Sequence, residues 1–150
     1  MTWMIAAVLA GIGVALFVAP HHRGYQSSAS LVKDFQELIL EGQIESPGVL
    51  MMAALAVVGC LGVFLPALLA ALIPLMPERT TRGVLIAGGV VLVVASALTF
   101  LVEIVSNMLI GFGGGSKYPI TTPVAYLAPL FPFLCGTAAI LIGIGRIRIR

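Results

Sequence analysis

Four long apolar segments constrain this chain more than any other feature of its sequence. They cover about residues 2–19, 49–75, 83–112 and 123–145, and Glu103 is the only charged residue within them. The hydrocarbon core of a bilayer is about 30 Å thick, and a helix of about 20 mainly apolar residues crosses it. Backbone groups cannot hydrogen-bond to lipid, so continuous runs of this kind span as helices. We therefore predict an all-α integral membrane protein, with four transmembrane helices in one domain over residues 1–150.

The composition agrees with a membrane setting and argues against other classes of protein. Hydrophobic residues make up 60% of the chain and charged residues 9%, whereas soluble domains carry about 25% charged residues. The formal net charge of +2 is too small to indicate nucleic-acid binding. Cys60 and Cys135 lie inside apolar runs, which argues against a disulfide framework or a zinc site. Residues 1–19 lack a basic leading region and a cleavage motif, so we expect a retained helix there.

The basic residues of the connecting segments predict the orientation. Residues 77–82 and 146–150 together hold five arginines, and they lie on the same side because an even number of crossings separates them. The opposite side holds Arg23, Lys33 and Lys117. Basic residues in short loops favour the cytoplasmic side of the membrane. We therefore expect the N- and C-termini in the cytoplasm.

The segment between the first two spans predicts an amphipathic helix over about residues 30–41, on the outer side of the membrane. Apolar residues recur there at helical spacing, Ser30 is a candidate N-cap, and Gly42 is a natural stop. The apolar face comprises Leu31, Val32, Phe35, Leu38 and Ile39, and the opposite face carries Asp34, Glu37 and Glu41 beside Lys33 and Gln36. An acidic face is not attracted to anionic lipid, so these three acids are candidates for contact with a protein partner.

Glu103 is the candidate for an intramembrane polar site. Asn107 lies one helical turn after it and Thr99 one turn before it, so the three share a face of the third span. An acid within a span indicates function by default, for example a proton or cation site. Glu103 is also expected close to the outer interface, where a carboxylate reaches water, a headgroup or another helix. We favour this structural interpretation.

Small residues predict where helices approach closely. Where lipid removes the hydrophobic drive between helices, small residues three or four positions apart allow tight packing, either within the bundle or against partners. The first span has such a row in Ala7, Gly11, Ala15 and Ala19, the fourth span has Gly136, Ala139 and Gly143, and the second has Gly59 and Gly62. Prolines at positions 66, 129 and 132 are expected to kink the second and fourth spans.

Part of the chain resembles a known family. The run from Ser30 to Leu38, then Gly42, then a long apolar span containing Pro66, resembles the helix-then-span pattern of paraquat-inducible protein A-type membrane domains, over about residues 27–75. The resemblance implies a four-helix protein of the bacterial envelope, hence a prokaryotic plasma membrane, in a family linked to lipid trafficking. The layout of the outer loops is also similar to claudin-like tetraspans. Residues 67–72 lack the basic residue that often follows the proline, and the zinc-binding cysteine pairs are absent, so no function is carried over.

Two functional hypotheses follow from these residues. The preferred one is a non-catalytic subunit or scaffold of a larger membrane assembly, with membrane lipids, other membrane subunits or further copies of the chain as partners. The alternative is a small transporter or channel component for lipid or an ion, using Glu103, Asn107 and the kinked helices. We expect no enzyme and no cofactor, because too few polar groups converge within the spans to hold a reacting centre.

Overall fold

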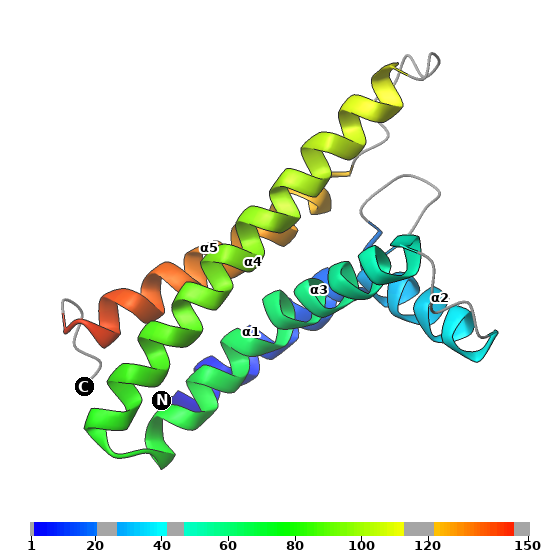
Figure 1. The fold of residues 1–150 in the computed structure, drawn as a ribbon. Helices are drawn as coiled ribbons and strands as arrows, with labels where there is room; N and C mark the ends of the chain where they lie inside the picture. Colours follow the sequence, from blue (N-terminus) through cyan, green and yellow to red (C-terminus); the bar gives the residue numbers. More distant parts are fainter. Residues whose placement is uncertain (1, 21–26, 42–46, 113–121, 146–150) are drawn as a thin grey trace.

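The computed structural model describes residues 2–20, 27–41, 47–112 and 122–145, and within these ranges all regular structure is helical (Figure 1). The elements are α1 (Thr2–Val18), α2 (Ser28–Leu40), α3 (Pro47–Leu72), the short 3₁₀ helix η1 (Ile73–Leu75), α4 (Glu78–Phe112) and α5 (Pro123–Gly143). The all-α prediction is confirmed for this part of the chain. Helices α3 and α5 continue through the prolines at positions 66, 129 and 132.

Three helical stretches are long and apolar enough to cross a membrane. They are Ala56–Leu75, Glu78–Leu101 and Pro123–Gly143, with 20, 24 and 21 residues. The chain is accordingly an integral membrane protein. Helix α1 is a shorter apolar helix of 17 residues, and a fourth span there stays a prediction.

The four long helices form two pairs. Helix α4 packs along α5 in the most extensive contact of the described residues, and α1 packs along α3. The pairs are joined through η1, the tight turn that follows it and the start of α4. We call residues 73–82 the hairpin. Figure 1 shows that the pairs lie close together at the hairpin and diverge away from it, and that α1 begins and α5 ends at the hairpin side. Helix α2 lies at the opposite end, against α3.

Glycines bring α4 and α5 into backbone contact. A Cβ added to Gly136 would lie 2.7 Å from the carbonyl oxygen of Gly89, and one added to Gly89 would lie 2.7 Å from the carbonyl oxygen of Gly136. Near the hairpin, a Cβ added to Gly143 would lie 2.7 Å from the Ile86 side chain and 3.1 Å from the carbonyl oxygen of Arg82. The predicted close-packing row Gly136, Ala139 and Gly143 is confirmed, since all three residues are buried.

The small-residue row predicted on α1 faces outward and does not pack against α3. Ala7, Gly11 and Ala15 are exposed, and nothing lies within 4 Å of a Cβ built on Gly11. The contact with α3 uses the other face, where Ala6 and Gly13 are buried and a Cβ on Gly13 would collide with the backbone of Val63. Small residues occur on both faces of α1, so their spacing alone does not identify the face that packs.

Helix α2 begins earlier than predicted. Its N-cap is Ser27 and not Ser30, because the Oγ of Ser27 accepts a hydrogen bond from the backbone N–H of Ser30 at 3.2 Å. The Ser30 hydroxyl donates in return to the Ser27 carbonyl oxygen at 2.9 Å. The first of these bonds satisfies one of the unpaired N–H groups of the first turn. Gly42, the predicted stop, lies outside the described residues.

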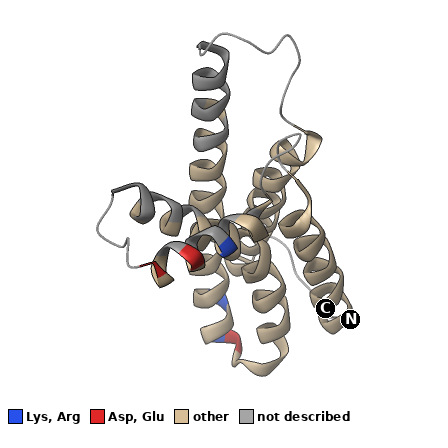
Figure 2. Cartoon of the chain, turned by 90° about the vertical axis from the view of Figure 1, so that its right-hand side faces the viewer, with Lys and Arg blue, Asp and Glu red and all other residues tan. Residues whose placement is uncertain are grey.

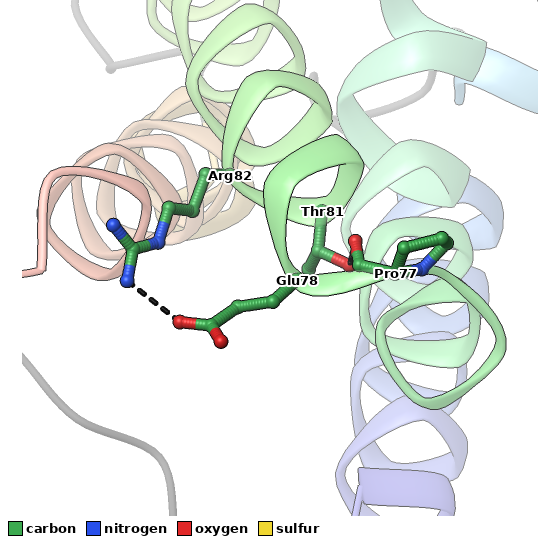
Figure 3. A network of polar contacts seen from close by, with 4 residues as sticks. All are labelled: Pro77, Glu78, Thr81 and Arg82. Carbon is green, nitrogen blue, oxygen red and sulfur yellow. Dashed lines mark hydrogen bonds and ion pairs between the residues drawn. The ribbon is translucent and has the colours of Figure 1, made fainter.

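Helix α4 also begins earlier, at Glu78 and not at residue 83, so most of the predicted loop is helical (Figure 3). The hydroxyl of Thr81 donates to the carbonyl oxygen of Pro77 at 3.0 Å and to that of Met76 at 3.2 Å. The guanidinium of Arg82 donates to the Glu78 carboxylate at 2.6 Å, one turn apart. An acid in the first turn is also favoured by the helix dipole. The hairpin is therefore tighter than the sequence indicated.

The glycine contact predicts a difference between two identical substitutions. Gly136→Ala should destabilise the protein by about 1–3 kcal/mol, the usual cost of overpacking a tight interface, because its Cβ meets the α4 backbone. Gly11→Ala should be neutral or slightly stabilising, since that position is open. Reversible unfolding in mixed detergent micelles measures both. Equal effects of the two substitutions would contradict the contact.

Candidate functional site

An apolar cavity of about 230 Å³ lies between the two helix pairs. All four long helices contribute to its wall, which includes Leu9, Pro66, Leu69, Leu92, Cys135 and Ile142. The Thr2 hydroxyl and the Cys135 thiol are the only side-chain heteroatoms among its lining residues. The cavity is partly open to the surroundings of the helices. Such a wall suits an apolar occupant.

A buried serine links α4 to α5. Ser96 is 5% exposed, and its hydroxyl donates a hydrogen bond to the carbonyl oxygen of Pro129 at 2.5 Å. A groove of about 330 Å³ lies beside this bond, with Phe100, Tyr126 and Phe133 in its wall. Ser96 is not among the residues that the sequence patterns predicted. The sequence feature that could have identified this residue is a hydroxyl within an apolar span. Such a group is costly to bury unless it has a hydrogen-bond partner.

The predicted site around Glu103 is only partly described. Thr99 is half-buried, and its hydroxyl donates to the Ala95 carbonyl oxygen of its own helix at 2.9 Å. Glu103 and Asn107 lie within α4, as predicted, but their side chains are outside the described residues. Thr99 is therefore satisfied without either residue, and a polar site involving all three stays a prediction.

Two of the three predicted contact acids, Glu37 on α2 and Glu41 at its C-cap, are accessible. Glu37 and Glu41 are exposed, and the Glu37 carboxylate lies 3.7 Å from the Lys33 ammonium in an exposed ion pair. The side chain of Asp34 lies outside the described residues, as do those of Leu31, Phe35 and Leu38 from the expected apolar face. Ile39 from that face is 41% exposed. The helix is present, and its amphipathic docking stays a prediction.

Among residues whose side chains are described, charge is confined to two places. Figure 2 shows these charged residues on and just after α2 and at the start of α4. No group of three or more histidine, cysteine, aspartate or glutamate residues that could hold a metal ion occurs among the described residues. Cys60 and Cys135 are free thiols. The described side chains of the spans contribute packing contacts, isolated hydrogen bonds and two free thiols.

The Ser96 bond predicts a modest loss of stability on deletion. Hydrogen bonds between membrane helices contribute about 0.6 kcal/mol on average and at most about 1.7 kcal/mol. Ser96→Ala should cost an amount in this range, because it leaves one buried bond between helices unmade. Thr99→Val should cost less, since that hydroxyl bonds only within its own helix. The unfolding free energies of both variants, measured in micelles, test this difference. A larger loss for Thr99→Val than for Ser96→Ala would refute the Ser96 bond between the helices.

The chain matches no protein-family model, and neither the curated proteins nor the solved structures contain a match to it. The resemblance to paraquat-inducible protein A-type domains and to claudin-like tetraspans therefore stays an expectation.

Proposed function

We propose that this protein is a non-catalytic membrane subunit or scaffold that packs against other membrane proteins of a larger assembly. The observation that carries the proposal is the outward row of small residues on α1. Ala7, Gly11 and Ala15 are exposed, while the opposite face of α1, at Gly13, is occupied by α3. A row of this spacing permits close approach by a helix of a neighbouring subunit. The row thus provides a membrane-embedded contact surface that the fold itself does not use.

The outer helix supports the same proposal. Glu37 and Glu41 on α2 are exposed, at the end of the molecule away from the hairpin. A basic surface of a partner would meet these acids outside the lipid. Each exposed ion pair contributes only about 0–1 kcal/mol, so α2 adds orientation and specificity to a contact that α1 makes by packing.

The assembly proposal includes a topology of four crossings with both ends in the cytoplasm of a prokaryotic cell. Helix α1 has 17 residues, about 26 Å at 1.5 Å per residue, and 17 residues are the lower limit for a spanning helix. The hairpin carries Arg79 and Arg82, and the sequence places three further arginines after α5. Basic residues of this kind favour the cytoplasmic side.

Accessibility of single cysteines checks the topology. In a protein whose Cys60 and Cys135 are replaced by alanine, Gln36→Cys on α2 should react with a membrane-impermeant maleimide in intact cells. Thr80→Cys at the hairpin should react only after the membrane is opened. Both positions are exposed, so burial does not confound the result. Labelling of Thr80→Cys alone in intact cells would reverse the orientation, and labelling of both would contradict the number of crossings.

Bulk added to the small-residue row checks the subunit proposal. Gly11→Leu should abolish association with the partner, because the leucine separates the two helices, while the folded monomer is preserved. Gly83→Leu is the matched control, since it makes the same change at another exposed position with nothing within 4 Å. Native mass spectrometry of the protein extracted in mild detergent measures the stoichiometry.

Two outcomes would refute the subunit proposal. One is a wild-type protein that is monomeric and without partners under these conditions, and the other is an unchanged complex with Gly11→Leu. In the same experiment, Glu37→Lys/Glu41→Lys should weaken the complex and change its salt dependence, because salt screens an attraction in the wild type and a repulsion in the variant. The control Gln36→Lys should not, because it adds charge to α2 without removing an acid.

A further inference from the structure

The cavity between the helix pairs has the properties of a hydrocarbon site. Its volume of about 230 Å³ exceeds that of the ~150 Å³ apolar cavity that stays free of water and takes up benzene. The surroundings of the spanning helices are themselves hydrocarbon, and the cavity is partly open to them. An unfilled cavity also forgoes dispersion contacts with its wall. A hydrocarbon chain that enters from the bilayer is therefore the occupant that the wall and its setting favour.

The position of the cavity identifies the leaflet that would supply this chain. Its wall includes Thr2 at the start of α1, Ile73 in η1 and Ile142 near the end of α5. These helix ends all lie at the hairpin side of the molecule (Figure 1). The cavity extends from there to Cys135 and Leu92, further along the helices. Its long direction therefore follows the helices, as an acyl chain of the hairpin-side leaflet does.

The hairpin end of the cavity also carries positive charge. Arg82 lies one turn before Leu85, which is part of the cavity wall, and its carbonyl oxygen is 3.1 Å from a Cβ built on Gly143 at the end of α5. The Arg82 guanidinium is paired with Glu78, as Figure 3 shows. Arg79 is exposed and has no hydrogen-bond or ion-pair partner among the described residues. The described residues of the hairpin thus carry one uncompensated positive charge, which complements a phosphate.

We propose that the cavity binds one acyl chain of a membrane phospholipid from the hairpin-side leaflet, with the phosphate of its headgroup at Arg79 and Arg82. The bound acyl chain fills the space that the side chains leave between the two helix pairs, and it thereby joins the pairs. The site does not depend on the subunit proposal, because the helices that line it belong to one chain.

A photoactivatable lipid tests the site. The purified protein is placed in nanodiscs containing phosphatidylglycerol with a diazirine midway along one acyl chain, and cross-linked peptides are mapped after irradiation. Cross-links should concentrate at cavity residues such as Ile5, Leu9 and Ile142. Ala138→Phe should lower their yield roughly tenfold, as expected for a loss of about 1.4 kcal/mol of binding free energy, because the ring fills the cavity from its rim.

Ala87→Phe is the matched control, since Ala87 is exposed on α4 and lies outside the cavity wall, and it should leave the yield unchanged. Equal yields in the two variants would overturn the proposal. So would wild-type cross-links spread evenly over outward residues such as Val90 and Val94, a result that needs no variant.

A diacylglycerol with the same diazirine should cross-link less than the phospholipid, and Arg79→Gln should remove that difference. Equal cross-linking by the two lipids in the wild type would overturn the assignment of the phosphate to the arginines.

Discussion

Close backbone contact at glycine is the interaction on which the rest of this structure depends. In lipid, helices gain little by hiding apolar side chains, so association relies on van der Waals contact at short range. Gly89 and Gly136 supply this between α4 and α5, and Gly13 supplies it between α1 and α3. Between the pairs, Gly88 leaves room for the side chain of Leu69 of α3, whose end would lie 2.8 Å from an added Cβ. Each helix pair is therefore held by close contact at a position without a side chain.

The hydrogen bond from Ser96 to Pro129 adds direction to this packing. Contact between glycines tolerates small sliding of one helix along another, whereas a hydroxyl that must reach one carbonyl oxygen does not. With Ser96 buried, the alternative is an unpaired polar group in a low-dielectric setting, which is costly. The bond thus defines the register of α4 on α5, and with it the positions of Leu92 and Cys135 in the cavity wall.

The cavity and the unused face of α1 have the same cause, which is that the helices pack closely at only a few positions. Glycine contacts hold each pair tightly, and the pairs diverge with distance from the hairpin (Figure 1). Side chains between them leave space on the inside, while Ala7, Gly11 and Ala15 remain uncovered on the outside. The two proposals concern these two places. The cavity is suited in size to a lipid chain, and the outward face of α1 is suited in shape to a neighbouring helix.

The sequence by itself determined that the chain is helical and apolar enough for a membrane, where the helices lie to within a few residues, and that Gly136, Ala139 and Gly143 form a packing face. It did not determine which face of α1 meets α3, which carbonyl oxygen Ser96 finds, or that a cavity exists. The reason is physical. In water an apolar stripe distinguishes the buried face of a helix, but α1 is apolar all round and lipid is as apolar as the interior of the bundle. Only the shapes of the neighbouring helices decide which face is buried.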